Sequence, residues 1–401
     1  MSKSIRVVIA GKNKIAIDIV TFMLKNVISK SELGVLFNST DKGIDSWQPS
    51  FRAYAIRNSL REFTLTEAQN LSDILFLSLE FDKILKPENF TSDNLVNIHF
   101  SNLPKYKGMY TSIYPILNDE DYAGVTLHRI DKGIDTGDII DSSNFSIDDK
   151  ITSEQLYSKY LQAGTELVIK NIDNLVNYTY SSHPQKSAQS SYYSRSSIDW
   201  DNIKLPTRKT AFEIHNYIRA FAFRPYQLPE FQGNKIMSSL VLGKKSVSTP
   251  GTIEFEGEHF LEISTIDYDL RLCFDITSKL IECAESNDLV QLKRFKSKGF
   301  RLDGRTTEGW SVAIVAAYNY RKETLNWLLS EGWNVNDQNF NGTTLSMYVM
   351  LASAKNDDIE WFVSFLSLGP DLKMKDYRGL DILDYAIKYH FNDHLIILKN
   401  I

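Results

Sequence analysis

Two short segments give the most information about this chain. The first is Val96-Asn97-Ile98-His99-Phe100-Ser101-Asn102-Leu103-Pro104-Lys105-Tyr106-Lys107-Gly108, and the second is Ile134-Asp135-Thr136-Gly137-Asp138. Residues 96–99 form an apolar, strand-like run, and residues 124–130 alternate like a second strand. Because residues i and i+2 of a strand point to one face, Asn97 and His99 are expected to face the same space. Asp135 follows the second run, so an amide, an imidazole and a carboxylate are predicted to meet.

The surrounding residues, 1 to about 180, alternate between strand-like and helix-like stretches. Short apolar runs at residues 5–10, 33–37 and 74–79 are typical of buried strands. Apolar residues recur at helical spacing over residues 16–24 and 153–176. Strands that alternate with helices predict βαβ units, so we expect residues 1–180 to form an α/β domain with a doubly wound, mostly parallel sheet.

Two further regions follow. Residues 181–197 are rich in Ser and Gln and indicate a linker. Residues 198–278 are expected to form a small β-rich domain, with a helix over 207–221 and strand-like runs at 239–243, 251–255 and 259–263.

The C-terminal part repeats. Gly309, Gly342 and Gly379 lie 33 and 37 residues apart, and Leu328-Leu329-Ser330-Glu331-Gly332 resembles Phe365-Leu366-Ser367-Leu368-Gly369. A 33-residue period built from a turn and two helices is the ankyrin signature. We therefore expect residues 279–401 to be an all-α stack of about three ankyrin repeats, with an insertion near residues 353–358.

Composition narrows the class of protein. The 401 residues are 43% hydrophobic and 24% charged with a net charge of -5, which fits a globular protein and disfavours a nucleic-acid partner. No apolar run approaches the roughly 20 residues that span a bilayer, and the N-terminus is better explained as a first strand than as a signal peptide. The spacing of the two cysteines matches no metal-binding motif, and the sequence contains no HExxH motif. We expect a cytoplasmic protein with no membrane contact and no metal.

The trio suits acyl transfer to an amine. His99 can accept a proton near neutral pH, Asn97 can donate a hydrogen bond to a developing oxyanion, and Asp135 can orient His99 or a water. Taken singly, a histidine on a strand is more often structural, and an aspartate before Thr-Gly more often forms a turn. The combination of all three is what favours catalysis.

The run from Asn97 to Gly108 resembles the N-x-H-x-S-L-L-P-x-Y-R-G signature of the folate-dependent formyltransferases, and residues 124–128 and 134–139 resemble that family's second block. The resemblance implies that Asn97, His99 and Asp135 are the catalytic triad and that N10-formyltetrahydrofolate is the co-substrate. Asn102 and Lys107 depart from the signature, in a loop that bears on the choice of acceptor. By the same resemblance, the pterin is bordered by Leu79, Phe81, Asp131 and Ile134.

The acceptor is suggested by a second resemblance. Residues 78–84, 192–200 and 218–227 look like the corresponding parts of dTDP-amino-sugar N-formyltransferases, and the ankyrin repeats point to the dTDP-3-amino-3,6-dideoxyglucose 3-N-formyltransferase type, which serves O-antigen and surface polysaccharide synthesis. Three alternatives stay open: a dTDP-4-amino sugar, methionyl-tRNA, or a non-catalytic ankyrin scaffold with a degenerate formyltransferase domain. A tRNA acceptor would call for a basic surface, whereas this chain is acidic.

The types of several residues suggest that they contact the sugar nucleotide. Aromatic rings can stack on thymine, and cations can bind the pyrophosphate. The resemblance to the formyltransferases implies that the loop after His99 lies on the acceptor side. The candidates are Phe221, Phe223 and Tyr226 for thymine, Arg219, Lys105 and Lys107 for the pyrophosphate, and Ser101 and Tyr110 beside them. The alternative for the aromatic residues is that they form the core of the small domain.

The repeats carry an aromatic group of their own: Trp310, Tyr318, Tyr320 and Tyr348. These side chains either pack the repeats, or bind a second nucleotide-sugar that regulates the active site, or bind a partner protein. A homodimer is expected from the family alone.

Overall fold

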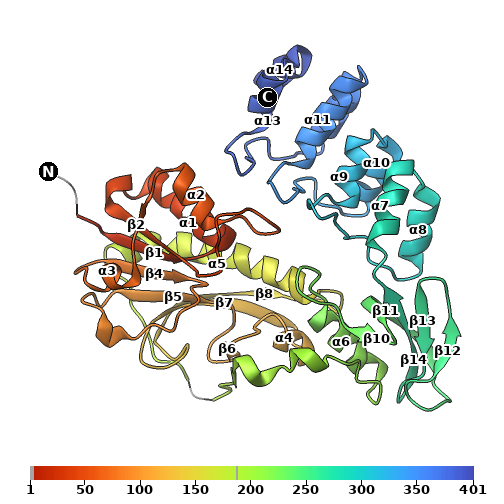
Figure 1. Cartoon of the computed structure of the whole chain (residues 1–401), viewed down its shortest axis with the longest axis horizontal. Helices are drawn as coiled ribbons and strands as arrows, with labels where there is room; N and C mark the ends of the chain where they lie inside the picture. The colour runs from red at the N-terminus through yellow and green to blue at the C-terminus, as the bar shows by residue number, and fades with distance from the viewer. Residues whose placement is uncertain (1–3, 187) are drawn as a thin grey trace.

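The computed structural model describes residues 4–186 and 188–401. An α/β domain, a small β-rich domain and a helical region follow one another along the chain, from the red and orange part of Figure 1 through green to blue. In the described part of the chain, no helix combines the length and the apolar character needed to cross a membrane.

The N-terminal domain is built on a seven-stranded sheet in the order β3-β2-β1-β4-β5-β7-β8, counted over the described residues. Its strands are β1 (Val7–Gly11), β2 (Leu33–Phe37), β3 (Arg61–Glu62), β4 (Leu75–Leu79), β5 (Leu95–His99), β7 (Tyr122–Arg129) and β8 (Ile139–Ser146). The first five in this order pair in parallel. Strand β7 runs antiparallel to both of its neighbours, β5 and β8. The predicted α/β fold is confirmed, with a mixed sheet.

Helices α1 (Asn13–Asn26), α2 (Phe51–Arg57) and α5 (Ser153–Val176) lie together over one side of this sheet in Figure 1, and α3 (Leu65–Gln69) lies toward its other side. Gly164 lets α5 approach β5 closely, since a Cβ there would lie 3.2 Å from the Phe100 ring and 3.4 Å from Ile98. Because Ile98 points under α5, its neighbours Asn97 and His99 point to the opposite face. That face is covered by loops, and it carries the site.

The small domain packs α6 (Ala211–Phe221) against a five-stranded antiparallel sheet in the order β10-β11-β14-β13-β12, counted over the described residues. The strands are β10 (Glu230–Phe231), β11 (Asn234–Lys245), β12 (Ile253–Glu256), β13 (Phe260–Ile263) and β14 (Tyr268–Phe274). Just before the small domain, β9 (Tyr192–Tyr193) pairs in parallel with β6 (Lys107–Gly108), which lies in the loop after β5. The short helix α4 (Tyr114–Leu117), between β6 and β7, contacts α6. Residues 191–193 are therefore anchored to the loop that follows His99.

Residues 277–401, all of them described, form four helix pairs, which we call the helical module. The helices are α7 (Thr277–Ser286), α8 (Leu289–Ser297), α9 (Val312–Tyr318), α10 (Lys322–Ser330), α11 (Leu345–Lys355), α12 (Ile359–Leu366), α13 (Ile382–Lys388) and α14 (Asn392–Lys399). Gly309, Gly342 and Gly379 precede α9, α11 and α13, each with a positive φ. Helix α11 has 11 residues where α9 has 7, which accounts for the longer second spacing.

The helical module is not a free appendage. Phe260 and Cys273 of the small sheet belong to the same buried cluster as Leu280 and Cys283 of α7. Both cysteines are free and buried in this apolar contact. The first helix pair therefore packs directly on the small domain.

Candidate active site

Strand pairing brings a fourth polar residue to the predicted trio. Asn97 on β5 is paired with His128 on β7, so the two side chains share a face of the sheet. The Nδ1 atom of His128 lies 2.8 Å from the carbonyl oxygen of Arg129, which can only accept, so Nδ1 carries the hydrogen. Nε2 of His128 is then free to accept a hydrogen bond from the Asn97 amide nitrogen at 3.0 Å. The second N–H of that amide donates no hydrogen bond within the described part of the chain.

His99 is held in one tautomer by the same logic. Its Nε2 lies 2.8 Å from the carbonyl oxygen of Tyr106 and donates to it. Nδ1 is the remaining, basic nitrogen, and it lies 3.5 Å from Oδ2 of Asp135. Burial lowers the pKa of His99, with the charge of Asp135 opposing the shift. His99 is therefore neutral near pH 7 and able to accept a proton on Nδ1.

Asp135 lies in the loop between β7 and β8, with a φ of 55°. Its Oδ2 accepts a hydrogen bond from the Gly108 amide at 2.9 Å, and its Oδ1 lies 3.6 Å from Nε2 of His128. Burial opposes its ionisation, but the two imidazoles and the Gly108 amide outweigh burial and hold the pKa of this carboxyl well below its usual range. Asp135 is thus a fixed negative charge that faces both histidines.

The sequence analysis did not identify two residues of this site, His128 and Gln185. His128 could have been found, because it lies in an alternating strand. No sequence pattern marks Gln185, since it lies in the segment interpreted as a linker. Its amide nitrogen donates to the carbonyl oxygens of Asp135, at 2.8 Å, and Gly137, at 2.9 Å, and so fixes the Asp135 loop.

The residues expected beside the pterin lie on two segments. Leu79 is buried at the end of β4, and Phe81 packs edge-on against Phe76 at 6.5 Å between ring centres. The Asp131 carboxylate accepts hydrogen bonds from the Gly133 amide, at 3.0 Å, and the Thr136 hydroxyl, at 2.7 Å, which shapes the loop. Ile134 is 40% exposed directly before Asp135.

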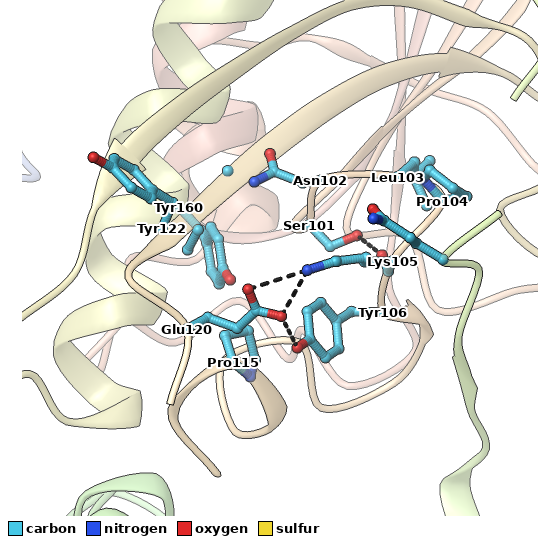
Figure 2. A pocket seen from close by; sticks show the side chains of 13 residues that line it. Ser101, Asn102, Leu103, Pro104, Lys105, Tyr106, Pro115, Glu120, Tyr122 and Tyr160 are labelled. Carbon is cyan, nitrogen blue, oxygen red and sulfur yellow. Dashed lines mark hydrogen bonds and ion pairs between the residues drawn. The ribbon is translucent and has the colours of Figure 1, made fainter. Parts of the chain in front are cut away.

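Ser101 and Lys105 line a cavity of about 290 Å³ behind the loop that follows His99 (Figure 2). The Lys105 ammonium donates to both carboxylate oxygens of Glu120, at 2.9 and 3.1 Å, and the Tyr106 hydroxyl donates to the same carboxylate at 2.6 Å. The Ser101 hydroxyl donates to the Lys105 carbonyl at 2.7 Å. The charge of Lys105 is therefore already balanced by Glu120.

Lys107 differs from Lys105. In the described part of the chain it takes part in no ion pair, and its charge adds to burial in lowering the pKa of His99. The hydroxyl of Tyr110 donates to the Arg195 carbonyl at 2.8 Å and accepts from the Trp200 indole at 2.9 Å, which ties the same loop to the segment before the small domain. Of the two lysines, Lys107 is the one whose charge acts on His99.

The candidates on α6 and the turn after it separate into two groups. Arg219 is buried and donates to the carbonyls of Asp148 and Ile151, at 3.0 and 3.1 Å, so its guanidinium is engaged within the protein. Phe221 is buried in the main core. Phe223 and Tyr226 instead lie against Trp47, each 5.5 Å away between ring centres.

Trp47, Tyr157, Phe223 and Tyr226 form what we call the aromatic wall, of which Tyr226 is 65% exposed. The Tyr157 ring also contacts Phe100, the residue after His99, at 6.0 Å. Its hydroxyl donates to Glu80 at 2.7 Å, and burial raises the pKa of Glu80. Glu80 directly follows β4, next to the point where the strand order reverses around β1. Ligands of open α/β sheets bind in the crevice at this position.

The aromatic residues of the helical module divide as well. Trp310 lies 4.9 Å from Tyr318 and 5.0 Å from Tyr348 between ring centres, and Tyr318 is 49% exposed while Tyr348 is buried. Tyr320 lies elsewhere: its hydroxyl bonds Asp358 and its ring packs on Trp361. The structure brings three of the four together.

Known proteins resemble this chain in sequence. A family model described as formyl transferase matches residues 54–172. The methionyl-tRNA formyltransferase of Clostridium tetani is 29% identical over 203 residues, which are 50% of this chain and 65% of that enzyme. The methionyl-tRNA formyltransferase of Macrococcus caseolyticus is 28% identical over 252 residues, 62% of this chain and 77% of that enzyme.

Solved structures resemble it more closely. WlaRD, a sugar 3N-formyl transferase crystallised in the presence of dTDP and 5-N-formyl-THF, is 46% identical with a TM-score of 0.64, over 68% of this chain and 99% of that one. The N-formyltransferase from Helicobacter canadensis, in complex with folinic acid and dTDP-3-aminofucose, is 46% identical with a TM-score of 0.64, over 67% and 99%. The chain therefore belongs to the formyl transferase family and groups with its sugar N-formyltransferases.

Proposed function

We propose that this protein moves the formyl group of N10-formyltetrahydrofolate to the amine of a dTDP-linked amino-dideoxy sugar, with dTDP-3-amino-3,6-dideoxyglucose as the acceptor. The observation that carries the proposal is the arrangement of Asn97, His99 and Asp135, with one free amide N–H and one basic imidazole nitrogen on the same face of the sheet. The 46% identity to a sugar 3N-formyl transferase supports an amine on C3.

In the proposed reaction the sugar amine attacks the formyl carbon, and the carbonyl oxygen becomes negative. The free N–H of Asn97 donates to that oxyanion. Nδ1 of His99 takes a proton from the attacking nitrogen and becomes an imidazolium facing the Asp135 carboxylate. The bond from the formyl carbon to N10 then breaks, N10 takes the proton that His99 accepted, and tetrahydrofolate leaves.

For the nucleotide we propose the aromatic wall as the binding surface. The exposed ring of Tyr226 and its neighbour Trp47 offer faces for thymine. Lys107 takes part in no ion pair within the described part of the chain and its charge acts on His99, so it is the cation that we propose for the pyrophosphate. Arg219 and Phe221 are better explained as structural residues, because one is engaged by carbonyl oxygens and the other lies in the core.

We further propose that the helical module is an ankyrin stack and that Trp310, Tyr318 and Tyr348 bind a ligand on it, either a second nucleotide-sugar or a partner protein. The exposed ring of Tyr318 supports a binding role, whereas Tyr320 is accounted for by packing. Removing the module would expose the shared core with the small domain, so Tyr318→Ala is the cleaner test. If the plot of rate against sugar-nucleotide concentration has the same shape in that variant as in the wild type, the module does not regulate the active site through this ligand site. A cytoplasmic homodimer remains a prediction.

The deciding experiment incubates the purified full chain with N10-formyltetrahydrofolate and a panel of dTDP-3-amino and dTDP-4-amino sugars of gluco and galacto configuration. Mass spectrometry reads the gain of a formyl group. Initiator methionyl-tRNA is included because the curated relatives carry that name. Formylation of a 3-amino sugar supports the proposal and fixes the configuration. Formylation of the tRNA alone overturns the sugar proposal, and intact folate with every acceptor favours the scaffold alternative.

A further inference from the structure

A short turn presents part of the aromatic wall. Residues 222–227 fold back on themselves, with the amides of Tyr226 and Gln227 donating to the Phe223 carbonyl at 2.9 and 2.8 Å. On one side of this turn, the Phe223 ring lies 5.5 Å from Trp47 and 5.9 Å from Tyr157 between ring centres. The position of Tyr226 therefore also depends on the contacts that the rest of this turn makes.

The other side is held by Arg224 through charged contacts. Its NH1 donates to Oδ1 of Asp303 at 3.0 Å, its Nε lies 3.5 Å from Asp275, and its backbone amide donates to Glu154 at 3.2 Å. These partners come from three parts of the chain: α5, the end of the small sheet, and the helical module. Arg224 is the point at which they converge.

Asp303 is the contribution of the helical module. It lies in the segment between α8 and α9, and its carboxylate accepts hydrogen bonds from Arg224, from Arg301 and, at 3.5 Å, from Gln155. Arg301 in turn donates to the Lys150 carbonyl at 2.8 Å, so both arginines bridge to the N-terminal domain. Burial opposes ionisation, but the two guanidiniums hold the pKa of Asp303 well below its usual range. The carboxylate is therefore charged at every pH at which the enzyme would act.

We propose that Asp303 is a positioning residue for the acceptor: it fixes Arg224, and through Arg224 the turn that carries Phe223 and Tyr226 against Trp47. The inference rests on the proposed function, because it takes the aromatic wall as the nucleotide site. It gives the helical module a direct part in shaping that site, separate from any ligand the module binds. Among the described residues, no contact of Arg224 or Asp303 involves Asn97, His99 or Asp135, so we expect the chemical step to be unaffected.

The expected kinetic result follows from that separation. Asp303→Asn keeps the size of the side chain and removes the charge that two arginines share, so the turn loses its anchor in the helical module. We expect the KM for the dTDP-amino sugar to rise about tenfold, a typical size for coupling through a contact network. The kcat and the KM for the formyl donor stay within about twofold. Asp303→Glu restores the charge and returns the KM toward the wild-type value.

Binding of dTDP to the full-length protein, measured by calorimetry, tests the inference without turnover. Asp303→Asn and Arg224→Lys are both expected to raise the Kd for dTDP; the second keeps a charge but cannot span Asp303 and Asp275 together. Glu331→Gln is the matched control, because it breaks an ion pair with Lys296 inside the same module. Its Kd should equal that of the wild type.

The outcomes separate the two proposals. If the wild type binds dTDP and formylates a sugar while Asp303→Asn and Arg224→Lys both fold and keep its Kd and KM, the positioning role is overturned and the proposed function stands. If the wild type neither binds dTDP nor formylates any sugar, both the proposed function and the positioning role of Asp303 are overturned. A fall in thermal stability with unchanged Kd counts as a merely structural role and against the proposal.

Discussion

Asn97 donates a hydrogen bond over 3.0 Å to Nε2 of His128, whose other ring nitrogen is engaged by the Arg129 carbonyl. One N–H of the Asn97 amide is therefore donated to His128, and the other is the one that we expect to face the substrate. It also places His128, rather than a residue of the loop after His99, next to the amide that we expect to stabilise the oxyanion.

The first prediction concerns that support. His128→Phe fills the buried position but cannot accept from Asn97, so the amide is free to rotate. We expect kcat to fall by about 10- to 100-fold, the usual effect of removing an orienting partner. Steady-state rates with saturating substrates check this, and His183→Phe, at an exposed histidine, is the control. A kcat equal to that of the wild type would show that Asn97 does not depend on His128.

The second prediction concerns the trio itself. His99→Asn removes the base, and Asp135→Asn removes the charge that faces the imidazolium. Each variant should lower kcat by at least about 10²-fold, the scale of general-base and electrostatic contributions. Single-turnover rates in a quenched-flow experiment isolate the chemical step. Near-normal turnover in either variant would contradict the assignment of the active site.

The third prediction is a pH dependence. His99 must be neutral to act as a base, so kcat is retained above its pKa and lost as the pH falls through it. Because burial lowers this pKa from 6.5, the acidic limb of kcat should lie below pH 6.5. The charge of Asp135 raises the pKa of His99, so Asp135→Asn should move the limb to lower pH. The same sugar is used throughout, so its own amine titrates equally in both profiles. An unshifted limb would point to another base.

The fourth prediction separates the two lysines of the loop. Lys107→Met should raise the KM for the sugar nucleotide by about tenfold, as expected for a lost charge-assisted hydrogen bond. Lys105→Met should leave that KM within about twofold and lower the thermal midpoint, because Lys105 already pairs with Glu120. Initial rates and thermal unfolding of both variants check this. The reverse pattern would return the pyrophosphate to Lys105 and the cavity beside it.

Features that depend on local periodicity could be predicted from the order of residues alone. Strand alternation placed Asn97 and His99 on one face, the alternation of strands and helices indicated the α/β fold, and the glycine spacing revealed the repeated C-terminal part. This was possible because these patterns report which face a side chain takes, and neighbours along the chain are enough to set that.

The contacts between side chains that are far apart in the sequence became visible only in the folded chain. Asp135 reaches His99 because a loop folds over the sheet, Lys105 is neutralised by Glu120, and Arg219 is engaged by backbone carbonyls. Phe223 and Tyr226 face Trp47 while Phe221 enters the core, although all three lie within six residues. Such choices depend on the packing of distant segments, which periodicity does not encode. The same holds for Asp303, whose link to Arg224 exists only because the helical module packs against the other two domains.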